Sequence, residues 1–186
     1  MHKPTVVLIL TLPLVAAAQP AAREYRVLAT TKTSTMEKEL NEAAEVGYGF
    51  SAAMGGSTAA GNEVVVVMTK LPADAPRRSY RLLATNRTST MQKELTEFGN
   101  EGFDYKGQTV FSSAFGGREV AVILERLEGG SKARILYRLQ ATSRTSTMQK
   151  ELNQMGEVGY EAVGLTVAQT SLGGNELVCI LRKRAE

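Results

Sequence analysis

The residues best suited to chemistry form one short motif that occurs three times. A cation precedes three hydroxyl residues in Lys32-Thr33-Ser34-Thr35, Arg87-Thr88-Ser89-Thr90 and Arg144-Thr145-Ser146-Thr147. Hydroxyl residues favour helix starts, where free backbone N–H groups and the helix dipole attract anions. The motif therefore predicts either plain helix capping with solvated cations or an anion-binding site at each of these corners. The candidate ligand-binding residues are Lys32, Ser34, Arg87, Ser89, Arg144 and Ser146.

Groups that usually catalyse reactions or bind metals are scarce. The sequence has one histidine, His2, and its aspartates are Asp74 and Asp104, so no matched set of acids, bases or metal ligands recurs in the repeats. Cys179 stands where the other copies have valine and has no accompanying base, which favours a buried core residue over a nucleophile. We therefore predict no catalytic residues, no metal site and no cofactor.

The first 18 residues have the pattern of a signal peptide. Lys3 gives a positive start, residues 6–15 are mostly apolar, and three alanines precede Gln19. The apolar run is shorter than the roughly 20 residues that span a bilayer. We expect cleavage after Ala18 rather than a retained anchor. The mature protein would then be exported, to the periplasm or outside the cell, with no transmembrane segment.

Composition limits the classes of partner. The chain is 43% apolar and 22% charged, as in a globular protein. Loss of Lys3 with the signal peptide would leave 21 basic and 19 acidic groups, since no other charged side chain lies in that segment. A net charge of +2 gives no reason to expect nucleic acid or an anionic membrane as partner. The single cysteine excludes an internal disulfide.

The motif belongs to a longer repeat. Residues 25–40 align with 80–95 and 137–152, so the copies start 55 and 57 residues apart. Units of this size bury too little surface alone and should pack on each other. We place the repeats at 24–71, 80–127 and 135–184, and the linkers at 72–79 and 128–134.

The pattern within each repeat predicts a helix after the first strand. Ser34, Ser89 and Ser146 precede Glu37, Gln92 and Gln149 by three residues, which is the spacing of a capping box at the helix start. Methionine and leucine then recur four residues apart and form one apolar face. Glycines that can adopt a left-handed conformation should end the helices; they are Gly47, Gly102 and Gly159.

Two further strands complete each repeat as β-α-β-β, with glycine-containing turns at 61–62, 116–117 and 173–175. The last strands, at 63–70, 119–126 and 176–182, have apolar residues at both odd and even positions, and therefore on both faces. A strand of this kind needs cover on both faces, which places it centrally in its sheet. One helix covers one face, so the other face must meet a neighbouring repeat or another chain. The predicted fold is α+β, three tandem β-α-β-β repeats with their sheets packed together, and a pseudo-threefold axis is one candidate arrangement.

A family resemblance supports this unit. Residues 150–163, Lys-Glu-Leu-Asn-Gln-Met-Gly-Glu-Val-Gly-Tyr-Glu-Ala-Val, and their first copy at 38–50 resemble the bacterial family described as domain of unknown function 4177. The resemblance would cover each repeat, and its motif is a packing pattern, with Tyr or Phe here where the family often has Trp. It implies a small β-α-β-β fold and brings no catalytic residues.

The corner itself is the most uniform part of the repeat. Copies two and three differ at only two of the 16 positions from tyrosine to leucine, whereas their second halves differ widely. Either packing between repeats or a shared ligand could hold the corner fixed. We therefore expect an exported non-catalytic protein that binds or scaffolds through its surface. The alternatives are a binder of small anionic ligands and an enzyme of unfamiliar type. Candidate partners are an anionic small molecule, a cell-envelope component and a second copy of the chain.

Overall fold

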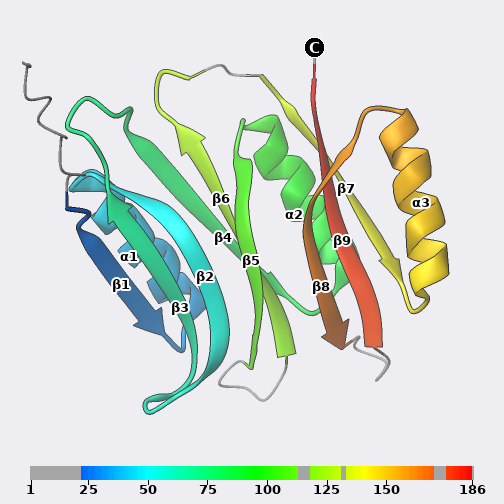
Figure 1. Ribbon diagram of the computed structural model, residues 1–186, viewed down its shortest axis with the longest axis horizontal. Helices are drawn as coiled ribbons and strands as arrows, with labels where there is room; N and C mark the ends of the chain where they lie inside the picture. The colour runs from blue at the N-terminus through cyan, green and yellow to red at the C-terminus, as the bar shows by residue number, and fades with distance from the viewer. Residues whose placement is uncertain (1–21, 113–117, 131–132, 170–174, 186) are drawn as a thin grey trace, which may run out of the picture.

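The computed structural model describes residues 22–112, 118–130, 133–169 and 175–185. The predicted signal peptide (1–18), the turn at 116–117 and residues 173–174 of the turn at 173–175 lie outside these ranges. Three repeats follow one another in a row, from the left to the right of Figure 1. Repeat one contains β1 (Tyr25–Thr30), α1 (Thr33–Glu45), β2 (Tyr48–Thr58) and β3 (Gly61–Lys70). Repeat two contains β4 (Arg78–Thr85), α2 (Thr88–Asn100), β5 (Asp104–Ser112) and β6 (Arg118–Leu127). Repeat three contains β7 (Ile135–Thr142), α3 (Thr145–Glu157), β8 (Glu161–Gln169) and β9 (Asn175–Arg184).

The predicted α+β class and the β-α-β-β order are confirmed. Each repeat forms a three-stranded antiparallel sheet with its last strand in the centre, in the orders β1-β3-β2, β4-β6-β5 and β7-β9-β8. The register is the same in each, since Val27 lies opposite Val67, Leu82 opposite Ile123 and Leu139 opposite Ile180. β4 begins at Arg78, inside the segment that the sequence assigned to a linker.

The helices end where the sequence predicts, but their starts differ from the prediction. Gly47, Gly102 and Gly159 come just after the helices with φ of 86°, 83° and 85°, as expected of glycines that terminate them. The capping-box prediction is wrong. The helices begin at Thr33, Thr88 and Thr145, the N-caps are Lys32, Arg87 and Arg144, and no side chain caps these ends.

Each sheet has two faces that meet different partners. The front face carries the side chains that pack on the repeat's own helix, such as Val64 and Val66. The back face carries the side chains of the residues that alternate with them along each strand. The first core joins α1 and the front face of repeat one to Tyr80, Ala121 and Ile123 on the back face of repeat two. The second core joins α2 in the same way to residues of repeat three, including Tyr137 and Ile180. Sheets therefore pack in succession, in a row rather than about a closed pseudo-threefold axis.

Cover on both faces of the central strand is complete in two repeats. Val120 to Leu124 in β6 and Val178 to Leu181 in β9 are all buried. In β3, Val64 and Val66 are buried on the front face, whereas Val65 and Val67 on the back face are only half-buried. The third core contains residues of repeat three alone, among them the buried Cys179, where burial raises the pKa of the thiol. Among the described residues, repeats one and three thus have a neighbour on one side only, whereas repeat two has one on both sides.

Candidate functional site

The predicted anion-binding residues lie at the surface of the three corners. Lys32, Arg87 and Arg144 are exposed, and the serines two positions later are exposed in the first helical turn. The turn is held by the last residue of each first strand. The hydroxyl groups of Thr30, Thr85 and Thr142 accept hydrogen bonds of 3.1, 3.1 and 3.3 Å from the backbone N–H groups of the three N-cap residues.

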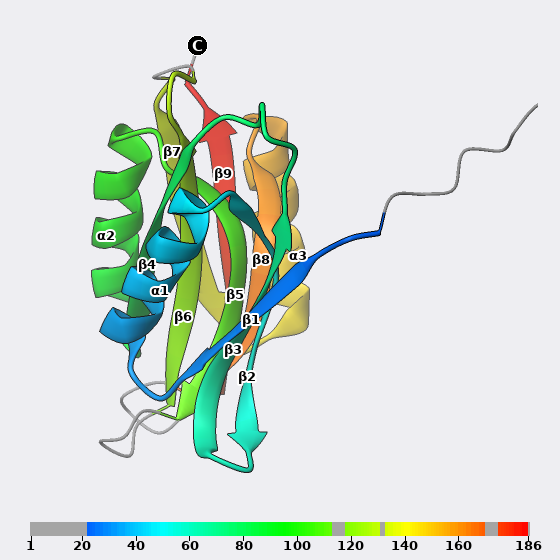
Figure 2. The ribbon, with the colours of Figure 1, turned by 90° about the vertical axis from the view of Figure 1, so that its left-hand side faces the viewer.

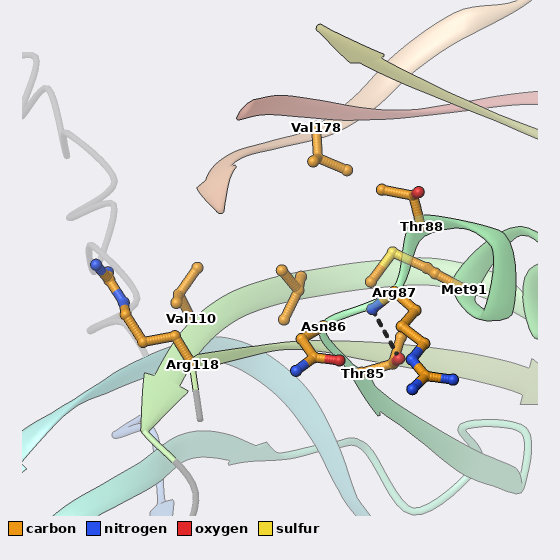
Figure 3. Close-up of a pocket in the computed structure, with 9 residues that line it drawn as sticks. Thr85, Asn86, Arg87, Thr88, Met91, Val110, Arg118 and Val178 are labelled. Atoms are coloured by element: carbon orange, nitrogen blue, oxygen red, sulfur yellow. Dashed lines mark hydrogen bonds between the residues drawn. The ribbon is translucent and has the colours of Figure 1, made fainter. Parts of the chain in front are cut away.

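A small hollow adjoins the second corner (Figure 3). Arg87 and Thr88 line it together with apolar side chains that include Met91 and Val178. The guanidinium groups of Arg87 and Arg118 point away from each other, and the room for water is about 20 Å³, enough for about one molecule. Ser34 lines a different hollow, formed with Leu82 and Phe98. The structure thus places the first and second corners at separate hollows.

Polar contacts between repeats centre instead on the helix face next to the following sheet. Asn41 of α1 donates to the carbonyl oxygen of Tyr80 (3.1 Å) and accepts from the N–H of the same residue (2.9 Å). One carboxylate oxygen of Glu37 accepts from the N–H of Leu82 (2.8 Å), and the other pairs with Arg81 (3.1 Å). These two side chains bind backbone groups along the edge strand β4.

The next junction repeats this arrangement. The side chain of Gln92 in α2 donates to the carbonyl oxygen of Tyr137 (3.1 Å) and accepts from the N–H of Leu139 (2.8 Å). Gln92 occupies the position of Glu37, and Tyr137 that of Tyr80. We call this arrangement, in which helix side chains bind the edge strand of the following repeat, the repeat junction.

A tyrosine from the following repeat is buried at each junction. Tyr80 is 1% exposed; its hydroxyl donates to Glu125 (2.6 Å) and accepts from the N–H of Phe50 in repeat one (2.9 Å). Tyr137 is 4% exposed and donates to the carbonyl oxygen of Phe103 in repeat two (2.9 Å). Burial is the main cause that raises the pKa of both hydroxyl groups far above the ordinary value, so both act as donors at neutral pH.

Glycines allow close approach at the junctions. A Cβ built on Gly99 of α2 would overlap the carbonyl oxygen of Ile135 and lie 2.8 Å from the ring of Tyr137. A Cβ on Gly107 of β5 would lie 2.8 Å from the ring of Phe50, and one on Gly164 of β8 would overlap side chains that include Tyr105. An aromatic residue of one repeat thus packs over a glycine of an adjacent repeat.

The two ends of the row expose the same positions that the junctions bury. The β1 face consists of Tyr25, Val27, Met54, Val65 and Val67 on the back face of the first sheet. Tyr25 and Val27 are 56% and 64% exposed, against 1% and 4% for Tyr80 and Tyr137. Figure 2 views the molecule from this end, with β1 in front.

The opposite end is the α3 face, on the right-hand edge of Figure 1. Its residues are Gln149, Leu152, Asn153, Gly156, Leu165 and Val167. Leu152 is half-buried, whereas the equivalent Leu40 and Leu95 are completely buried. Leu165 and Val167 are 59% and 58% exposed. A Cβ built on Gly156 would meet nothing within 4 Å. This end has the form of a junction with no following repeat among the described residues.

Comparison of the chain with known protein families, curated proteins and solved structures gives no match. Within the described ranges, no helix is both long and apolar enough to cross a membrane. The same residues contain no group of three histidine, cysteine or acidic side chains that could hold a metal ion. The geometry of the end faces is therefore the main guide to function.

Sequence reasoning missed the junction residues and both end faces. The signal was nonetheless present, because a glutamate or glutamine follows the first methionine of every helix, at positions 37, 92 and 149. An asparagine four residues later occurs at 41 and 153. Polar residues repeated beside an apolar helix face indicate hydrogen bonds that the repeats share.

Proposed function

We propose that this chain is an exported, non-catalytic repeat protein that binds or scaffolds a macromolecule through its two end faces. The observation that carries the proposal is the contrast in exposure between equivalent residues. Val27 is 64% exposed, whereas Leu82 and Leu139 at the same position are half-buried against the preceding helix. Apolar side chains at positions that the internal junctions bury are left exposed at both ends, which favours binding.

The polar corners fit the same proposal without a ligand. Glu37 and Gln92, which the sequence assigned to capping, are used at the repeat junctions. Packing between repeats therefore accounts for part of the uniformity of the corner. The resemblance to the family of unknown function agrees with a packing unit, since it brings no reactive group.

Site-specific photo-crosslinking tests the proposal. A benzophenone side chain at position 27, in protein isolated from the exported fraction and starting at Gln19, should give covalent adducts with a partner. The same group at position 46 is the control, because Val46 is also exposed (51%) but lies outside the end faces. Adducts at 27 and none at 46 are expected. Absence of any adduct at 27 would contradict the proposal.

A second candidate function is the binding of a small anion at the surface of a corner, favoured by the exposed cation and serine at the start of each helix. Under this reading phosphate or sulfate raises the temperature of unfolding, and Arg87→Gln reduces that rise, because the free N–H groups and the cation act together. Thermal unfolding with phosphate, sulfate, sugar phosphates and uronic acids measures the effect. No shift with any of these compounds eliminates this candidate.

A further inference from the structure

We propose that copies of this chain associate head to tail, with the α3 face of one copy packed on the β1 face of the next. The contact would reproduce the repeat junction, with repeat one of the second copy taking the place of a fourth repeat. The inference rests on the proposed function and identifies the partner as a second copy of the same chain.

The polar side chains of α3 match those that form the internal junctions. Gln149 has the same residue type and helix position as Gln92, and Asn153 the same as Asn41. In α3 these two side chains are exposed and bind each other, with 3.0 Å between Gln149 Nε2 and Asn153 Oδ1. Rotation of either carboxamide would free it to bind the backbone of an edge strand, as Gln92 and Asn41 do.

The β1 face provides the strand that these side chains require. β1 is an edge strand, and an edge strand presents backbone donors and acceptors to a partner. It opens with Tyr25-Arg26, as β4 opens its repeated part with Tyr80-Arg81 and β7 has Tyr137-Arg138. The exposed Tyr25 would occupy the buried place of Tyr80 and Tyr137. Gly156, like Gly99, leaves room for that ring.

Side-chain sizes are also compatible at the new contact. Within the chain, Phe50 packs over Gly107 and Tyr105 over Gly164. Ala162, on the side of the α3 face, corresponds to the aromatic residue, and Ala52, on the side of the β1 face, corresponds to the glycine. Their positions before and after the strand bulges establish this correspondence. At the new contact, Ala52 replaces the glycine that faces an aromatic ring inside the chain, and Ala162 replaces the aromatic residue. The two alanines can therefore meet without overlap.

Unlike faces meet in this contact, so it is heterologous. Such a contact gives a ring if the rotation between copies closes and a filament if it does not. It also predicts that blocking either face alone stops growth, while two chains blocked at opposite faces can still form one contact with each other.

The experiment uses two variants of the chain that starts at Gln19, blocked at opposite ends. Val27→Glu places a charge on the β1 face, and Gly156→Arg fills the α3 face. Both should fold, because Val27 is 64% exposed and a Cβ at Gly156 meets nothing. Circular dichroism verifies folding. Sedimentation equilibrium should show a mass above that of one chain for the unmodified protein, and the mass of one chain for each variant alone. An equimolar mixture should double that single-chain mass. Val46→Glu is the control and should associate like the unmodified chain.

An unmodified protein that stays at one chain at every concentration overturns the inference. So does a folded variant that associates alone as the unmodified chain does, or a mixture without a two-chain species. These results are distinct from failure of the proposed function. A crosslink from position 27 to a different protein, with a purified chain that stays monomeric, would preserve end-face binding and reject self-association.

Discussion

Replacing Gly99 by alanine lowers the free energy of unfolding by about 2 kcal/mol. The added Cβ overlaps the carbonyl oxygen of Ile135, a backbone atom, so repeat three must move away from α2. Overpacking of this kind costs about 1–3 kcal/mol, and the better helix propensity of alanine offsets part of it. Urea unfolding followed by circular dichroism measures the change.

The matched replacement is Gly156→Ala at the same helix position of repeat three. A Cβ meets nothing there, so the helix propensity of alanine acts alone and stabilises the protein by about 0.5–1 kcal/mol. The free energy of unfolding should therefore fall for Gly99→Ala and rise for Gly156→Ala, although the two positions are equivalent. Equal effects would mean that α2 does not approach Ile135 closely or that α3 is already covered in the dilute protein.

The second large effect is expected at Glu125, a buried acceptor of repeat two that binds the hydroxyl of Tyr80 beside the first junction. Glu125 is 5% exposed and contacts Tyr80 (2.6 Å), Arg78 (3.4 Å) and Lys106 (2.9 Å). Glu125→Ala leaves the mostly buried Arg78 without its carboxylate and the hydroxyl of Tyr80 without its acceptor. Loss of one partner of a buried pair costs about 3–5 kcal/mol. The same urea titration measures this loss.

Two controls distinguish the effect of losing the buried contacts of Glu125 from the effect of losing a negative charge. Glu125→Gln keeps an acceptor for Tyr80 and should cost about 2 kcal/mol, less than the alanine variant. Glu42→Ala removes the partner of Lys38 in a pair whose side chains are 57% and 76% exposed, and should change stability by less than about 0.5 kcal/mol. Similar losses for Glu125→Ala and Glu42→Ala would show that Glu125 has no special role at the junction.

Patterns local to one repeat predicted most of the fold. Apolar alternation gave the strands, and the run of valines in β3 and its equivalents placed the last strand at the centre of each sheet. Gly47, Gly102 and Gly159 marked the helix ends because a positive φ is needed there. These features depend on residues that are close together in the sequence, so one sequence is enough to predict them.

The helix starts and the junctions could not be predicted in the same way. Glu37 has the spacing of a capping box, but its carboxylate binds Leu82, 45 residues further along the chain. A local pattern does not reveal the edge of the next sheet. Tyr25 and Tyr80 likewise have nearly the same local sequence, and only the presence of a preceding helix makes one exposed and the other buried. The corner residues Lys32, Arg87 and Arg144 remain a prediction for the anion experiment.

The side chains of Asn41, Glu37 and Gln92 also protect the protein from aggregation. They occupy backbone groups along β4 and β7 that an extended segment of another chain could otherwise pair with. β1 has no such cover from a preceding helix among the described residues. When the protein is concentrated or overproduced, disordered aggregation should therefore start at this strand, and a charged side chain at position 27 should improve solubility.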